Sequence, residues 1–222
     1  MSDDSQPVRL VVLISGSGSN LQAIIDATRS GQIPAQIAAV VSNRPGVKGL
    51  ERAKQAGIPA RVLDHTEFDG REAFDRALMA QIDEFSPDLV VLAGFMRILT
   101  PTFANHYAGR MLNIHPSLLP KYQGLNTHQR VLDAGDREHG VTVHFVTAEL
   151  DGGPPAVQAR LAVRPGDDAA ALASRVQRQE HRIYPLAIQW FAQGRLRMHN
   201  GQSLLDGEPL PASGYLIETE AD

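Results

Sequence analysis

Short apolar runs that alternate with helix-like segments most constrain what this chain can fold into. The first run, residues 9–14, is continuously apolar after Arg9 and ends in the small-residue segment Ser15-Gly16-Ser17-Gly18-Ser19-Asn20. Continuous apolar runs of this kind are typical of strands buried on both faces of a parallel sheet. Similar runs follow at residues 37–42, 60–63 and 89–93. Strands that alternate with helices predict an α/β fold with a doubly wound, mainly parallel sheet.

The segments between these runs have the apolar spacing of amphipathic helices. The longest, residues 68–85, places Phe74, Leu78 and Ile82 on one stripe and ends before Pro87. Shorter helices are predicted from residue 20 to about Gly31, at residues 51–56 and at residues 101–107.

The second half of the chain has a different pattern. Residues 141–146 and 156–163 alternate as half-exposed strands do, and a Gly-Gly-Pro-Pro turn joins them, which predicts an antiparallel extension. A long helix is predicted from Asp167 onward, with a kink or a break at Pro185. No composition shift marks a linker, so residues 1–222 are predicted to form one domain, with residues 1–7 as a flexible polar tail.

A polar pair at the end of a further strand gives the clearest sign of chemistry. Residues 110–115 are predicted to form a short buried strand that Pro116 ends, and on it Asn113 and His115 project to the same side. The amide can donate a hydrogen bond to an oxyanion, and the imidazole can move a proton near neutral pH. Asp151, in the downstream Gly-Gly turn, is expected to approach the imidazole and orient or charge it. Together the three residues predict an acyl-transfer site without a metal.

The small-residue segment after the first strand favours a phosphate site. Gly16 and Gly18 begin a dinucleotide-binding pattern, but Leu21 stands at its third glycine position, and no Gly-Lys-Ser/Thr sequence is present. A turn that leads into a helix offers backbone N–H groups and the helix dipole to an anion. The alternative is a simple turn with Ser19 or Asn20 as the helix N-cap.

Composition excludes several classes of function. The net charge of -4 gives no basic footprint, so no nucleic-acid partner is predicted. Cysteine is absent, which excludes disulfides and thiolate metal sites and fits a cytoplasmic location. No apolar run has the length of a membrane span, so no membrane partner is predicted. The oligomeric state, monomer or homodimer, stays open.

The histidines other than His115 show no metal-ligand spacing. Among them His144 alternates within a predicted strand. It is interpreted as a structural residue, with the wall of a site as the alternative.

Four motifs together resemble the folate-dependent phosphoribosylglycinamide formyltransferases of purine biosynthesis, over about residues 8–218. The motifs are the turn at residues 15–21, the segment Ala93-Gly94-Phe95-Met96-Arg97-Ile98-Leu99, the run from Asn113 to Pro120, and residues 139–153. The resemblance implies a Rossmann-like formyltransferase fold. It also implies transfer of the formyl group of 10-formyltetrahydrofolate to the glycinamide amine of the phosphoribosyl substrate, so the expected partners are small molecules.

The resemblance further implies roles for individual residues. Gly18, Ser19 and Asn20 would hold the substrate phosphate, and Glu180 would contact the sugar hydroxyls. The folate-binding set would be Arg71, Met96, Arg97, Ile98, Leu99, Asn113, Thr147, Ala148, Glu149, Leu150 and Asp151. Without the resemblance, Arg71 and Glu180 are interpreted as solvated helix charges, and Arg97 as a snorkelling side chain.

Three other functions are weighed against this one. Formyltetrahydrofolate deformylases share the catalytic trio, but they carry an N-terminal regulatory domain, for which the few residues before the first strand leave little room. Methionyl-tRNA formyltransferases would add a C-terminal domain and usually a basic surface, and neither is expected from this sequence. A folate- or nucleotide-binding module would have a degenerate site, whereas Asn113, His115 and Asp151 are all present.

Overall fold

The structure is a computed structural model that describes residues 6–219, and the chain divides into two compact units, Met1–Arg97 and Ile98–Asp222. Residues 1–5 of the predicted flexible tail lie outside the described residues, and the first strand begins at Val8. A single domain over residues 1–222 therefore stays a prediction. Each unit is described by itself.

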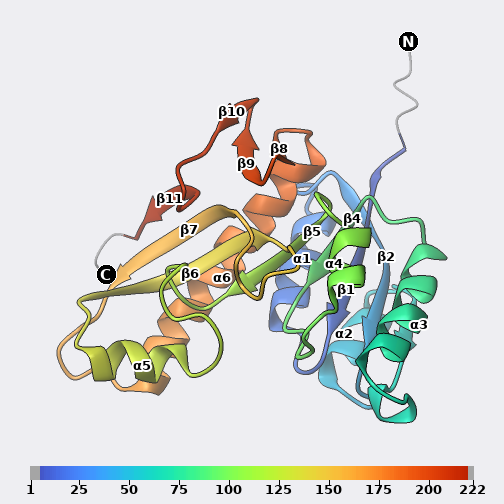
Figure 1. The fold of residues 1–222 in the computed structure, drawn as a ribbon, viewed down its shortest axis with the longest axis horizontal. Coiled ribbons are helices and arrows are strands. Elements are labelled where there is room, and N and C mark those ends of the chain that lie inside the picture. The colour runs from blue at the N-terminus through green and yellow to red at the C-terminus, as the bar shows by residue number, and fades with distance from the viewer. Residues whose placement is uncertain (1–5, 220–222) are drawn as a thin grey trace. The chain divides into compact units, whose positions relative to one another are not determined.

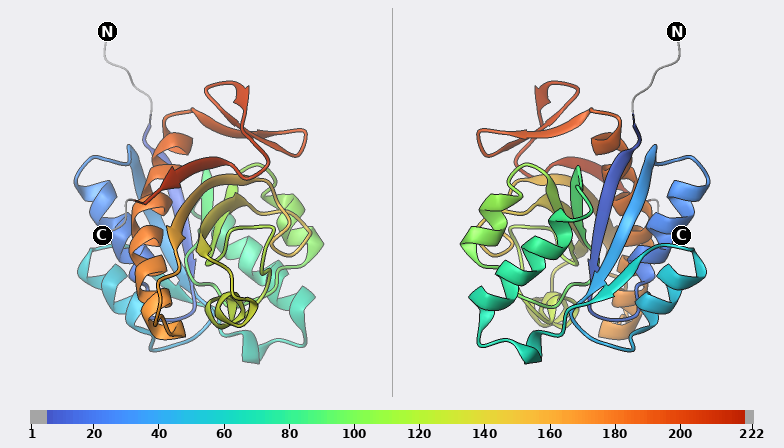
Figure 2. Two further views of the ribbon diagram at one scale, coloured as in Figure 1. Left: turned by 90° about the vertical axis from the view of Figure 1, so that its left-hand side faces the viewer. Right: turned by 90° about the vertical axis from the view of Figure 1, so that its right-hand side faces the viewer.

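The first unit is a parallel sheet with helices on both sides. Its elements are β1 (Val8–Ile14), α1 (Ser19–Arg29), β2 (Ala35–Ser42), α2 (Lys48–Gln55), β3 (Ala60–Val62), the 3-10 helix at His65–Glu67, α3 (Arg71–Asp83) and β4 (Leu89–Leu92). The strands lie in the order β4-β1-β2-β3, and every pairing among them is parallel. Helices α1 and α2 lie on one side of these strands and α3 on the other (Figures 1 and 2). The predicted doubly wound α/β arrangement is confirmed.

Burial explains why these segments form strands. Leu10 to Ile14 of β1 are each 0% exposed, so both faces of this central strand are covered. The apolar stripe of α3 is buried as the spacing predicted, at Phe74, Leu78 and Ile82. The unit thus closes around a core that its own sequence pattern specifies.

The second unit combines antiparallel strands with one long helix. Its elements are α4 (Pro101–His106), β5 (Met111–His115), α5 (Thr127–Ala134), β6 (Glu138–Phe145), β7 (Pro155–Ala162), α6 (Ala169–Ala192), β8 (Leu196–His199), β9 (Gln202–Leu205), β10 (Glu208–Pro209) and β11 (Tyr215–Glu218). Strand β6 pairs antiparallel with β5 and with β7, whereas β11 pairs in parallel with β7. Helix α6 packs against β6 and β7 (Figure 1). Strands β8, β9 and β10 form a small separate sheet.

The structure corrects several boundaries. The helix predicted from residue 68 begins at Arg71, because Gly70 has a positive φ of 98° that a helix does not contain. Helix α6 runs through Pro185 without the break that was one of the two predicted outcomes. Helix α5 and the short strands β8 to β11 were not predicted, since segments of two to eight residues carry little periodicity. No helix within residues 6–219 is long and apolar enough to span a membrane.

Candidate active site

Strand β5 presents its two polar residues on one face, as its alternation predicted. Asn113 pairs with His144 of β6, and His115 pairs with Thr142. Directly opposed residues of an antiparallel pair share a face, so these four side chains lie on the same side of the sheet. The amide oxygen of Asn113 accepts a bond from the Ile114 N–H at 2.9 Å. The Nδ2 group of Asn113 is the donor that this side chain can offer to a substrate.

His115 is held from both sides of its ring. Its Nε2 lies 2.8 Å from the Tyr122 carbonyl oxygen, and its Nδ1 lies 3.6 Å from Oδ2 of Asp151. A carbonyl can only accept, so Nε2 carries a proton and Nδ1 is the atom that faces the carboxylate. The side chains of His115 and Asp151 are each 8% exposed. The structure therefore brings this predicted pair together in a nearly dry environment.

Asp151 is fixed by the backbone around it. Its φ is 50°, in the left-handed region, and its Oδ2 accepts a bond from the Gly124 N–H at 3.0 Å. Two residues later, a Cβ on Gly153 would lie 1.8 Å from the carbonyl oxygen of Phe145. Only glycine fits at that position, so the turn can pass close to the end of β6. This close approach places the carboxylate beside β5.

His144 is a site residue that sequence reasoning interpreted as structural. Its Nε2 lies 4.0 Å from Oδ1 of Asp151, so the carboxylate is flanked by two imidazoles. Its Nδ1 lies 3.0 Å from the Phe145 carbonyl oxygen. Burial lowers the pKa of His144, and the Phe145 carbonyl and the Asp151 carboxylate act in the opposite direction. His144 thus lies beside the candidate catalytic carboxylate, and its role as a wall of the site, the alternative interpretation, stays a prediction.

The contacts from Tyr122 and Gly124 were not predicted either. Both residues belong to the loop between β5 and α5, and they reach the site through backbone atoms. Backbone contacts do not depend on side-chain type, so no sequence motif could mark them. The loop nevertheless holds both members of the His115–Asp151 pair.

The glycine turn of the first unit leads directly into the first residue of helix α1. Gly18 is the N-cap of α1 with φ 72°, in the left-handed region, and as a glycine it supplies no capping side chain. The alternative with Ser19 or Asn20 as N-cap is therefore wrong. A Cβ on Gly18 would lie 2.7 Å from the Cα of Gly49, so a larger residue would collide with α2. The Arg52 Nε donates to the Ser17 carbonyl at 2.8 Å, which puts a cation beside the turn.

The folate-binding residues expected in the first unit lie at the ends of its elements. Arg71 is the exposed first residue of α3. Met96 is 62% exposed, and its N–H donates to the Ser15 hydroxyl at 2.8 Å. The guanidinium carbon of Arg97 lies 5.3 Å from the centre of the Phe74 ring, so this side chain stacks on a core aromatic.

The remaining expected ligand residues belong to the second unit. Leu150 is 55% exposed on the turn between β6 and β7, which also carries Thr147, Ala148 and Glu149. Ile98 is 50% exposed, Leu99 follows it, and Glu180 is half-buried on α6. The ligand-binding roles of all these residues stay predictions.

Comparison with known proteins identifies relatives of high similarity. Residues 8–188 match the model of the formyl transferase family. The chain is 59% identical over 211 residues to the phosphoribosylglycinamide formyltransferase of Escherichia coli, covering 95% of this chain and 100% of that protein. It is 46% identical to part of the human trifunctional purine biosynthetic protein adenosine-3, covering 90% of this chain and 20% of that protein.

A solved structure has the same fold. The phosphoribosylglycinamide formyltransferase of Coxiella burnetii, solved in complex with CHES, is 54% identical and has a TM-score of 0.92. The match covers 96% of this chain and all of the Coxiella chain. The agreement confirms the predicted Rossmann-like formyltransferase fold.

Proposed function

The chain belongs to the formyl transferase family, and from this premise we propose that it transfers a formyl group from a folate-derived donor to the amine of phosphoribosylglycinamide, in purine biosynthesis. The Escherichia coli relative is matched over its entire length and carries the name of this transferase. The relatives described above include no hydrolase, so the deformylase alternative has no support from them. The finer identity of the donor, 10-formyltetrahydrofolate, rests on the resemblance of the four motifs.

The observation that carries the mechanism is the His115–Asp151 pair beside Asn113. The imidazole and the carboxylate are 3.6 Å apart and nearly buried, and the amide stands on the same strand face. An oxyanion donor next to an oriented proton carrier is the arrangement that acyl transfer needs. The binding-module alternative would not require this geometry.

In the proposed mechanism, Asn113 stabilises the oxyanion and His115 carries a proton. The substrate amine attacks the formyl carbon, a C–N bond forms, and the formyl oxygen becomes an oxyanion that accepts a bond from Asn113 Nδ2. The intermediate collapses as the bond from the formyl carbon to the folate nitrogen breaks. The amine loses a proton and the folate nitrogen gains one. His115, held by the Tyr122 carbonyl and by Asp151, is positioned to carry it.

Most of the proposed ligand-binding residues lie at the ends of helices or strands or in the loops beside them. The start of α1 at Gly18, Ser19 and Asn20 suits the ribonucleotide phosphate, because backbone N–H groups and the helix dipole both attract an anion. Glu180 is assigned to the sugar hydroxyls. Exposed apolar side chains at Met96, Ile98 and Leu150 suit the flat pterin ring of the folate. Arg71 and Arg97 supply positive charge for its glutamate tail.

In the proposed formyl transfer, protein side chains stabilise the oxyanion and carry the proton, so no metal requirement is expected. Within residues 6–219 no three His, Asp or Glu side chains gather as a metal site would need. We predict from composition that the chain has no nucleic-acid or membrane partner and that it is cytoplasmic. The oligomeric state, monomer or homodimer, stays open.

An assay of formyl transfer tests the function. Purified protein is mixed with the formylated folate, with and without phosphoribosylglycinamide, and free folate and formylated ribonucleotide are both quantified. We expect folate release only when the amine is present, in equal amount to the formylated product, and unchanged by a chelator. Release without the amine would indicate a hydrolase. Binding without release would indicate a binding module.

A further inference from the structure

A cavity lined by arginines lies in the second unit, and none of its lining residues has a role in the function proposed above. Its volume is about 390 Å³, and its lining consists of Leu161, Arg164, Arg175, Arg178, Gln179, Arg182, Glu218 and Thr219. This volume falls within the range of about 300–1,000 Å³ that is usual for small-molecule sites. Four arginines and one glutamate thus line a space large enough for a ligand.

The helix supplies three of the cations from one face. Arg175, Arg178 and Arg182 are three and four residues apart on α6, a spacing that brings side chains next to one another. Like charges at these spacings repel, and a bound anion would relieve that repulsion. Arg178 and Arg182 are exposed, and neither forms an ion pair with any residue in the described range 6–219.

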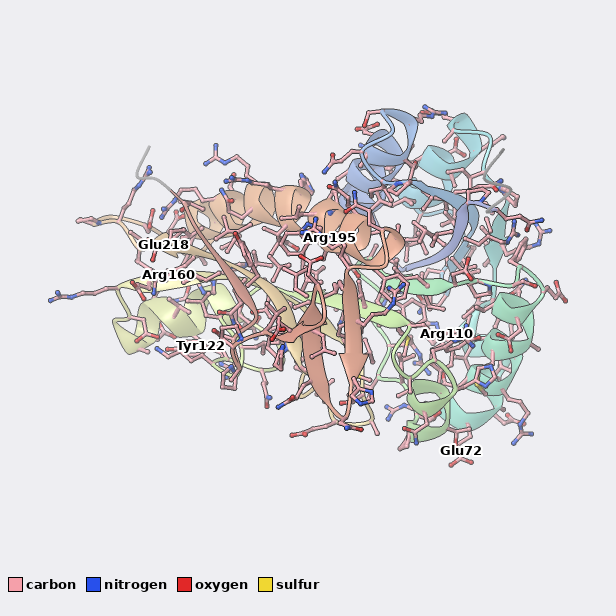
Figure 3. The ribbon with its side chains drawn as sticks, turned by 90° about the horizontal axis from the view of Figure 1, so that it is seen from above. Glu72, Arg110, Tyr122, Arg160, Arg195 and Glu218 are labelled. Carbon is pink, nitrogen blue, oxygen red and sulfur yellow. The ribbon has the colours of Figure 1, made fainter. Side chains whose placement is uncertain are left out.

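The acidic groups near the cavity are already engaged. Asp167 pairs with Arg175, which also donates to the Ala162 carbonyl at 2.8 Å, so Arg175 is fixed as one wall. Glu218 pairs with Arg160 of the neighbouring strand, and Figure 3 shows these two side chains next to each other. Among the lining residues that the structure describes, the arginines therefore outnumber the carboxylates.

The chemistry of the lining indicates the class of ligand. Planar guanidinium groups match phosphate oxygens with paired hydrogen bonds. Leu161 is the single apolar residue of the lining, and no aromatic ring is present to stack on a base. The net charge of -4 also disfavours a nucleic acid as the ligand. We propose that this arginine cavity is a second anion site, which binds small molecules through two or more adjacent phosphate groups.

Calorimetric titration of the full chain with inorganic pyrophosphate tests the proposal. The test variant is Arg178→Gln with Arg182→Gln. The matched control is Arg29→Gln with Arg76→Gln, which removes two exposed helical arginines of the first unit. We expect the dissociation constant to rise about tenfold or more in the test variant and to stay unchanged in the control. Thermal melting without pyrophosphate verifies that both variants fold, and added pyrophosphate should raise the melting temperature less in the test variant.

Three results would overturn the proposal. Equal affinity in the test variant and in the wild type would place the anion elsewhere, for instance at the start of α1. Equal weak binding of sulfate and pyrophosphate would show an adventitious ion only. Equal loss of pyrophosphate binding in the test and the control variants would show that overall positive charge, and not this cavity, attracts the anion.

Discussion

At the scale of single residues, Asn113 offers the sharpest test of the proposed oxyanion contact. Replacing it by Ala removes the Nδ2 donor, and loss of one such donor typically costs about 100- to 1,000-fold in turnover. Asn113→Asp should be at least as damaging, because it places a negative charge where the oxyanion forms. Steady-state turnover in the formyl-transfer assay measures both, and near-normal turnover of Asn113→Asp would contradict the assignment.

The charge of Asp151 can be removed without removing the hydrogen bond that this side chain accepts in the turn. Asp151→Asn keeps an oxygen that can accept the Gly124 N–H bond, which is 3.0 Å long, but it removes the charge beside His115. We expect turnover to fall on the order of 100-fold, at the lower end of what general acid–base catalysis contributes, because His115 itself remains. The Michaelis constants should change little. A large rise in the Michaelis constant for the formylated folate, with unchanged turnover, would instead make Asp151 a ligand-binding residue.

A histidine pair in the second unit should make the stability of the fold depend on pH. Nδ1 of His128 lies 3.0 Å from Nε2 of His139. Burial lowers the pKa of His139 to about 4, and burial also lowers the pKa of His128. The unfolded chain takes up these protons near pH 6.5, whereas the folded chain resists until lower pH. Stability should therefore be unaffected above about pH 6.5 and fall as the pH drops from about 6.5 to 4.

Urea unfolding at several pH values measures this effect. We expect a loss of up to about 3 kcal/mol across that window, and His139→Gln should flatten the slope. His199→Gln is the control, because His199 is exposed. The same slope in the His139→Gln variant would assign the pH dependence to other groups.

At the scale of elements, a buried hydrogen bond joins helix α6 to strand β5. The Tyr184 hydroxyl donates to the Leu112 carbonyl at 2.9 Å, and Tyr184 is 0% exposed. Tyr184→Phe leaves that carbonyl without this donor, which should lower the free energy of unfolding by about 1–2 kcal/mol. Urea unfolding measures it, with Tyr215→Phe as the control because Tyr215 is 45% exposed. Equal stability of both variants would show that the bond contributes nothing.

At the scale of the whole molecule, the cooperativity of unfolding tests whether the chain is one domain. The boundary between the two compact units falls at Arg97 and Ile98, within an apolar Met-Arg-Ile-Leu segment that lacks the composition of a linker. We therefore expect one thermal transition, with equal calorimetric and van't Hoff enthalpies. Two resolved transitions would show that the units fold independently.

The sequence by itself determined the class of fold and the central pair of the site. Alternation within residues 111–115 placed Asn113 and His115 on one face, because a strand allows side chains only two directions. The continuous burial of β1 followed in the same way from an apolar run. These are local properties, so a window of a few residues contains them.

Only the tertiary structure decided what surrounds that pair. His144 lies beside Asp151 because β6 pairs with β5 in one register, and Tyr122 and Gly124 reach the site through backbone atoms. The arginine cavity gathers side chains from β7, α6 and β11, which are far apart in the chain. Register, backbone contacts and such convergence depend on how distant segments pack, and no short stretch of sequence encodes that.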